Sequence, residues 1–332
     1  MLSFLLLGTA FALTPPVGSD LHCSYLKNRD LTPRARGQAA AVAPAHPPLI
    51  ASPAYIPERV YDTRRKTFTD FEAMLADLAR ADVIIVGEQH DDPNTHRLEA
   101  AVLQGLIRRR VAVTVSLEMF ERDVQATLDA YLAGSIDEDA FLKASRPWPR
   151  YATDYRALVE MARAHAWPVV ASNVPRRLAS EVAKGGAAAL AKASSDEPAL
   201  TARSVQCPLD GYFERFSATI NAHPAPGAEK KSEDEKRAAT ERYYLSQCLK
   251  DETMAESIVA AFERQAGRTG AIVHYNGAFH SDFGTGVAER VRRRLPTCRI
   301  AIVSMLPVQD IDALAPEGED LLRAEYLVYT VK

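Results

Sequence analysis

Short apolar runs alternate with amphipathic segments along most of the chain from Val60 onward. The runs are nearly continuous in Val, Ile, Ala and Leu, which is typical of parallel strands buried on both faces. They predict strands at 83–86, 111–117, 168–172, 271–275 and 299–304, and a final strand at 326–331 on an edge. The segments between them predict helices at 69–80, 94–110, 121–133, 153–166, 175–184 and 284–294. The pattern therefore predicts an α/β fold, with a mainly parallel central sheet and helices on both faces.

Two stretches depart from this alternation. Residues 186–267 read as a helical insertion between two core strands, broken by a polar loop at 222–236. Residues 23–58 are rich in proline and alanine without sustained periodicity, which is typical of a flexible linker. We therefore expect a leader at 1–22, a linker at 23–58 and one α/β domain at 59–332.

The first twelve residues form an apolar run that ends in Ala10-Phe11-Ala12, similar to a signal-peptide core with its cleavage site. The run is too short to span a bilayer, and no Lys or Arg precedes it. Cys23 offers a lipidation site as an alternative, although Asp20-Leu21-His22 is a poor lipobox. The segment predicts export to the periplasm or to a membrane-anchored position in the cell envelope.

Composition narrows the function classes. The 332 residues are 47% hydrophobic and 25% charged, with a net charge of −3, so no strong positive field invites nucleic acid. The four cysteines, Cys23, Cys207, Cys248 and Cys298, show no C-x-x-C spacing, which argues against a zinc ribbon. In an exported protein, a disulfide between Cys207 and Cys248 is the first pairing to test. The equally weighted alternative is that all four cysteines are buried or free thiols.

A glycine-x-x-histidine tetrad occurs twice, each time where an apolar run stops: Gly87 to His90, and Gly277 to His280. The carboxyl ends of parallel strands open onto a shared crevice, so the two histidines are expected to converge. Glu88 lies within the first tetrad, and Glu118 directly follows the strand at 111–117. Two carboxylates with two imidazoles suit a metal ion or acid/base catalysis.

Plainer explanations compete at several of these positions. Asp92 or Asn94 is expected only to cap the next helix. Glu118 has an ion pair with Arg122 as its ordinary alternative. His274 lies inside a predicted strand and is expected to be a core histidine, which leaves His280 as the functional one.

Aromatic and basic residues form a further group of candidates. Tyr151 and Tyr155 could offer phenol oxygens to ferric iron, although tyrosines more often only pack and hydrogen-bond. Asn173 and Arg176 end a predicted strand at the same crevice, and Arg176 could hold a carboxylate or propionate in a bidentate pair.

Taken together, six strings in order resemble the ChaN family of haem-binding, iron-regulated lipoproteins, within the group that includes the Tiki metalloproteases, TraB proteins and erythromycin esterases. The strings are GEQHDDPNTH, SLEMF, WPRYATDYRALVEMA, ASNVPR, QCLKDETMAESI and GAFHSDFGTG. The resemblance covers roughly residues 60–310. It implies haem bound by a tyrosine, with a histidine reaching a propionate across a homodimer. No motif identifies which tyrosine would bind the haem iron, so Tyr151, Tyr155 and Tyr275 all remain candidates for that role.

The Tiki-like relatives imply a second function. In them the two tetrad histidines and the strand-end glutamates serve a divalent metal and hydrolysis, which would use Glu88, His90, Glu118 and His280. We therefore carry three hypotheses: a haem-binding protein of iron uptake, with His90 and His280 among its cofactor contacts; a metal-dependent esterase or peptidase; and a non-catalytic scaffold for another small ligand. Sequence does not decide between them, because these side chains serve haem, metal or proton transfer alike.

Overall fold

The computed structural model describes residues 55–110, 112–222, 232–265 and 270–332. Within them, eight strands form one sheet in the order β2-β1-β8-β7-β3-β6-β4-β5. The strands are β1 (Glu58–Asp62), β2 (Thr67–Thr69), β3 (Val83–Glu88), β4 (Val113–Glu121), β5 (Val169–Asn173), β6 (Ala271–Gly277), β7 (Ile300–Val308) and β8 (Tyr326–Val331). All pairs from β8 to β5 are parallel, and only β1 pairs antiparallel with its two neighbours. The predicted α/β fold is confirmed.

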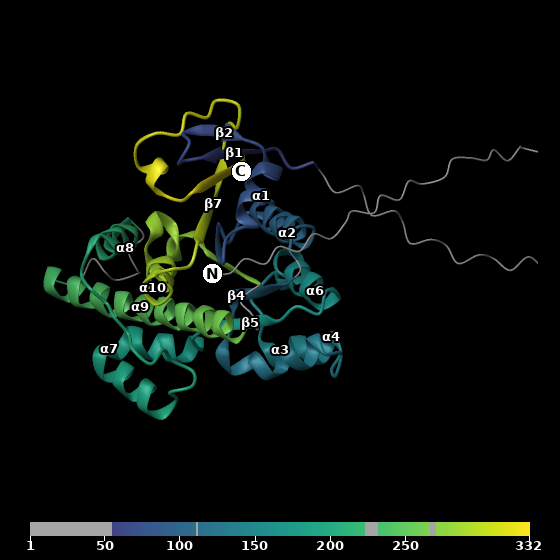
Figure 1. The fold of residues 1–332 in the computed structure, drawn as a ribbon. Coiled ribbons are helices and arrows are strands. Elements are labelled where there is room, and N and C mark those ends of the chain that lie inside the picture. Colours follow the sequence, from purple (N-terminus) through teal and green to yellow (C-terminus); the bar gives the residue numbers. More distant parts are fainter. Residues whose placement is uncertain (1–54, 111, 223–231, 266–269) are drawn as a thin grey trace, which may run out of the picture. The chain divides into compact units, whose positions relative to one another are not determined.

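Helices cover both faces of the sheet (Figure 1). They are α1 (Phe71–Leu78), α2 (Pro93–Ile107), α3 (Gln125–Leu132), α4 (Glu138–Ser145), α5 (Tyr151–Asp154), α6 (Arg156–Ala164), α7 (Arg176–Asp196), α8 (Gly211–Ala222), α9 (Glu233–Arg264) and α10 (Gly286–Arg294). Among the described residues, none of these helices has the length and apolar character needed to cross a membrane.

The two faces follow from alternation within the strands. On β3, Ile84 and Val86 pack into the core beneath α1 and α2, whereas Val83 and Ile85 pack beneath α9 and α10. All four side chains are fully buried. Both faces of a parallel strand lie in a core, which is why the sequence showed continuous apolar runs rather than alternating ones.

The prediction that the last strand lies on an edge is wrong. β8 pairs in parallel with β7 and antiparallel with β1, so it lies inside the sheet. The hairpin of β1 and β2, which the sequence pattern did not predict, occupies that edge. Its strands of five and three residues are too short to give a clear periodic signal.

The helical insertion consists of the end of α7 together with α8 and α9. Helix α9 begins at Glu233, inside the polar loop expected at 222–236. Ser232 and Glu235 form a capping box, each side chain bonding to the backbone of the other, so the charged run is the first turn of a helix. The predicted leader and most of the predicted linker lie outside the described residues.

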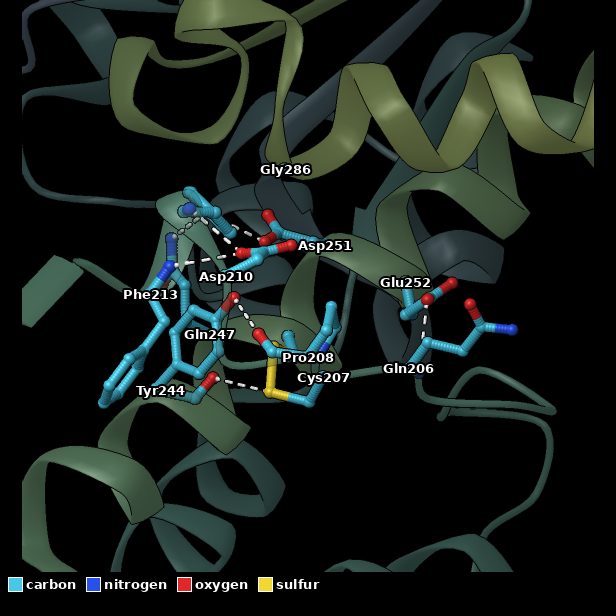
Figure 2. Close-up of a disulfide and its surroundings, with 12 residues drawn as sticks. Gln206, Cys207, Pro208, Asp210, Phe213, Tyr244, Gln247, Asp251, Glu252 and Gly286 are labelled. Atoms are coloured by element: carbon cyan, nitrogen blue, oxygen red, sulfur yellow. Dashed lines mark hydrogen bonds between the residues drawn. A yellow bond between two sulfur atoms is a disulfide. The ribbon is translucent and has the colours of Figure 1, made fainter. Parts of the chain in front are cut away.

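Cys207 and Cys248 form a disulfide with a Cα–Cα distance of 5.6 Å, so the first pairing that the sequence suggested is confirmed. It fastens the segment before α8 to α9 (Figure 2). Next to it, the Tyr244 hydroxyl donates to the Pro208 carbonyl at 3.1 Å. The bridge therefore holds α8 at a set position against α9.

Candidate functional site

The first tetrad lies at the carboxyl end of β3. Glu88 is still part of the strand and fully buried, and its carboxylate contacts the Nδ1 atom of His90. The Tyr155 hydroxyl donates to the same carboxylate at 2.9 Å. Burial alone would raise the pKa of Glu88, but His90 and His96 lower it to about 2. Glu88 is therefore held as a carboxylate.

Behind Glu88 lies a buried cluster that consists of Glu88, His96 and Glu99. Of these three residues, only Glu88 was a candidate site residue in the sequence analysis. The Nδ1 atom of His96 is 3.0 Å from oxygens of both Glu88 and Glu99, and its Nε2 atom is 3.1 Å from the His90 carbonyl. Burial would lower the pKa of His96, but the two carboxylates raise it to about 10. Glu88, His96 and Glu99 lie close enough together to hold a metal ion.

The second tetrad faces Glu118 and a carboxylate from helix α9. Glu118 accepts a 2.8 Å hydrogen bond from the Gly277 backbone amide and lies 3.3 Å from His280 Nε2. The other ring nitrogen, Nδ1, is 2.5 Å from Asp251. Burial opposes charge on His280, yet these two carboxylates raise its pKa to about 10. His280 is thus fixed as an imidazolium between two acids.

The two tetrads meet at Gly277. A Cβ atom on this glycine would lie 2.6 Å from His90 Nε2, so only glycine lets the imidazole pack here. Gly87 lies within β3 rather than in a turn. A Cβ atom there would lie 2.9 Å from the Ala278 Cα atom, so Gly87 allows close approach of the second tetrad. The predicted convergence of the tetrads is confirmed.

A cavity of about 670 Å³, here called the tetrad cavity, opens beside these residues. Its lining includes the tetrad residues Glu88, His90 and His280, together with Gln247, Arg215, Phe283 and Arg323. The guanidinium groups of Arg215 and Arg323 lie 4.7 and 4.9 Å from the Phe283 ring centroid. Its size and mixed lining suit an organic ligand.

The other predicted residues lie elsewhere. Tyr155 is buried behind Glu88, Tyr151 packs on Phe120, and Tyr275 donates to the Glu99 carbonyl at 3.3 Å. The tyrosines at 151, 155 and 275 are each at most 4% exposed and do not line the tetrad cavity.

Asn173 and Arg176 also lie apart from the tetrad cavity. Asn173 donates to the Glu118 carbonyl at 3.1 Å, and Arg176 lines a different hollow. The structure therefore brings Glu88, His90, Glu118 and His280 together but not these two residues or the tyrosines. Whether any of them contacts a cofactor stays a prediction.

Of the simpler structural roles considered for Asp92, His274 and Glu118, the structure supports the first two and not the third. Asp92 caps α2 by accepting from the Thr95 amide at 2.7 Å, as expected. His274 is fully buried beside Ser116, and burial lowers its pKa to about 3, as fits a neutral core histidine. The alternative partner for Glu118 is wrong, because Arg122 pairs with Glu256 at 3.3 Å instead.

Sequence reasoning missed Asp251, Gln247 and Tyr212. The Tyr212 hydroxyl donates to Asp251 at 2.9 Å and accepts from Gln247 at 3.2 Å, so the three hold His280 from the insertion. The string QCLKDETMAESI at 247–258, which holds Gln247 and Asp251, contributes to the family resemblance but indicates no site residue by itself. Its position on a helix far from any strand end gave no sign that Asp251 would reach the sheet.

Fold and site define the class: an α/β protein with paired histidines and carboxylates at adjoining strand ends, and a cavity of mixed polar and apolar lining beside them. Residues 74–291 match the family model described as haem-binding uptake, Tiki superfamily, ChaN, and the chain belongs to that family. No curated protein matches the chain.

One of the similar solved structures, the first named here, shows the same fold. ChaN of Campylobacter jejuni, reported with cofacial haem binding, has a TM-score of 0.61 at 17% identity, over 83% of this chain and 97% of that one. An erythromycin esterase, EreC, has a TM-score of 0.41 at 13% identity over 83% of each chain. The toxin effector domain RRSP of Vibrio vulnificus has a TM-score of 0.36 at 17% identity, over 71% of this chain and 36% of that one.

Proposed function

We propose that this protein binds haem in the cell envelope and takes part in haem or iron uptake. The observation that carries the proposal is a family match to haem-binding uptake proteins over residues 74–291, in a chain whose insertion helices bound two adjoining hollows. The first is the tetrad cavity. The second, of about 480 Å³, is lined by residues of α7, α8 and α9 and is called here the α7–α9 hollow.

The lining fits such a ligand. Phe216 and Ile220 of α8 face both hollows and supply apolar contact for a macrocycle. Arg215 in the tetrad cavity and Arg176 in the α7–α9 hollow offer guanidinium groups, which pair well with propionates. Bound haem would supply the iron, and this chain would supply the apolar wall, the cations and the axial ligand.

Envelope location and assembly form part of the proposal. The apolar N-terminus supports export, and the Cys207–Cys248 disulfide is of a kind that persists in oxidising compartments. Cys23 would be the anchor if the mature chain is lipidated. Cofacial haem binding in the Campylobacter jejuni relative supports a homodimer that pairs two haems.

A haemin titration tests the function. The full chain should give a saturable Soret band at one haem per chain, and sedimentation should show a haem-dependent dimer. Ile220→Glu places a charge in the half-buried shared wall and should weaken binding roughly tenfold or more, because bound haem would cover the unpaired carboxylate and remove it from water. Asn221→Glu adds the same charge at an exposed neighbour on α8 and should bind normally. No saturable band in the wild type would refute the proposal.

A second candidate, a metal-dependent hydrolase, rests on the convergence of Glu88, His90, Glu118 and His280. Imidazoles and carboxylates are ligands that zinc accepts, and the metal would lower the pKa of a bound water. Among the described residues, the ligand atoms close enough to share one ion are those of Glu88, His96 and Glu99, so the candidate requires His280 to leave its two carboxylates. One carboxylate would remain to accept a proton.

Esterase and peptidase screens with metal analysis test this candidate. His90→Ala and chelation should each abolish activity, whereas Asn221→Glu should not change it. A rate that survives either treatment would exclude the metal-dependent mechanism.

A further inference from the structure

Helix α2 and the end of β3 bring one histidine and two glutamates together behind the tetrad cavity. His96 and Glu99 are three residues apart on α2, so their side chains share one face of the helix. That face lies against Glu88, the last residue of β3. The three side chains are buried, with at most 3% of any of these residues exposed. Glu88, His96 and Glu99 are called here the Glu–His–Glu cluster.

The contacts of His96 orient its ring toward the two carboxylates. Its Nε2 atom lies 3.1 Å from the His90 carbonyl oxygen, which can only accept a hydrogen bond, so Nε2 carries a hydrogen. In a neutral imidazole the other nitrogen, Nδ1, then has a free lone pair. Nδ1 lies 3.0 Å from an oxygen of Glu88 and 3.0 Å from an oxygen of Glu99. Three electron-pair donors therefore converge, and a proton or a metal ion must lie between them.

A single proton does not satisfy this cluster. A hydrogen on Nδ1 points in one direction, and the hydrogen bond that it forms is to Oε2 of Glu99. Oε2 of Glu88 lies at the same distance from Nδ1, yet among the described residues neither this atom nor Oε1 of Glu99 has a hydrogen-bond partner. Buried acceptors without a donor are costly. A metal ion removes this cost, because it accepts a lone pair from each residue and its two charges balance the two carboxylates.

Distances and donor types indicate the class of ion. Two ligand atoms that each lie about 2.1 Å from an ion are about 3.0 to 3.4 Å apart at octahedral or tetrahedral angles. The two separations of 3.0 Å from His96 Nδ1 fit this range. Imidazole nitrogen suits zinc and other first-row transition metals, whereas calcium and magnesium prefer oxygen ligands. The donor set therefore favours a divalent transition-metal ion.

Outer contacts hold the cluster as they do in protein metal sites. A ligating histidine usually donates its other N–H to a carbonyl or a carboxylate, and His96 donates to the His90 carbonyl. The other oxygen of Glu88, Oε1, accepts from the Tyr155 hydroxyl at 2.9 Å. The Tyr155 ring also packs edge-on against the His96 ring. Because Glu88 lines the tetrad cavity, an ion can enter from that side.

We propose that the Glu–His–Glu cluster binds one divalent transition-metal ion through His96 Nδ1 and one carboxylate oxygen each from Glu88 and Glu99. The site does not use the tetrad histidines, and the proposal does not depend on haem binding. The ion replaces the proton that the cluster otherwise holds, and that proton passes to solvent. It joins α2 to the end of β3 and fixes Glu88, which in turn contacts His90.

Zinc titration of the metal-free full chain tests the site. Zinc is the probe because it binds such ligands more tightly than manganese or ferrous iron. After treatment with a chelator and dialysis, wild type should bind one Zn²⁺ per chain and unfold at a higher temperature with zinc than without it. X-ray absorption of the zinc-loaded protein should show one imidazole among oxygen ligands, a readout that needs no variant. Wild type that binds no zinc, or that binds it through two imidazoles, overturns the proposal.

Variants of the cluster test the ligands. His96→Ala and Glu99→Gln should each weaken zinc binding roughly 100-fold or more, since loss of even an outer partner costs about 10- to 100-fold. Two controls should keep the wild-type affinity: His280→Gln, which alters the second tetrad, and Glu252→Gln, which removes a buried glutamate outside the cluster. Circular dichroism checks that each variant is folded.

Zinc binding that survives both cluster substitutions, or that either control weakens to the same extent, shows that the assigned ligands are wrong. The haemin titration is a separate measurement on wild type. A chain that binds zinc as described but no haemin keeps this site and loses the proposed function, and the reverse result does the opposite.

Discussion

Replacing Glu252 with glutamine should lower the free energy of unfolding by roughly 3 kcal/mol, because a buried ion-pair network loses the carboxylate that three arginines share. The Glu252 side chain is fully buried on α9. It lies 2.5 Å from Arg294, 2.7 Å from Arg293 and 3.3 Å from Arg290, all on α10. Arg293 and Arg294 are partly exposed and can turn to water, but Arg290 is buried. The expected loss is therefore at the lower end of the range for broken buried pairs.

Denaturant unfolding at several pH values measures this effect. Burial would raise the pKa of Glu252, but Arg294 and Arg293 lower it below its ordinary 4.5. A lowered pKa means that the carboxylate stabilises the fold above pH 4.5, and that the stability is lost as pH falls through the lowered value. The difference in unfolding free energy between wild type and variant should thus have its full size near neutral pH and should disappear in acid.

Glu72→Gln is the matched control for Glu252→Gln. Glu72 also pairs with two arginines, Arg108 and Arg109, but its side chain is 55% exposed. Solvent screens such pairs, so the unfolding midpoint should hardly move. Equal effects of the two substitutions would show that burial of Glu252 does not set its contribution.

Removing the disulfide by Cys207→Ala with Cys248→Ala should cost roughly 2 to 4 kcal/mol of unfolding free energy. The bridge closes a loop across a sequence separation of 41 and so restricts the unfolded chain. It also fastens α8, which carries Tyr212 of the His280 network and the shared wall of the two hollows.

Chemical denaturation with and without a thiol reductant checks this expectation. Wild type should lose stability on reduction, and the double variant should be indifferent to the reductant. Cys298→Ala, at a cysteine outside the bridge, should keep the wild-type response. A double variant as stable as oxidised wild type would show that the bridge adds no stability.

The amino-acid sequence alone determined the α/β class and most of the strands. Local periodicity carries this information, because a strand buried on both faces must be apolar at every position. It also placed both tetrads at strand ends, where parallel strands bring Glu88, His90, Glu118 and His280 together. For the cysteines, the sequence favoured a Cys207–Cys248 disulfide and left four free or buried thiols as the alternative.

Only the tertiary structure decided the surroundings of those residues. Asp251 and Gln247 lie on α9, and nothing in their local sequence pattern shows that they will face His280 at a strand end. The position of β8 inside the sheet likewise depends on its pairing with β1, a strand of five residues. Contacts across long sequence separations are set by how whole elements pack, and packing depends on the shape of the complete core rather than on neighbours in sequence. For the same reason the sequence favoured Tyr151, Tyr155 and Tyr275, which the structure places in the buried core.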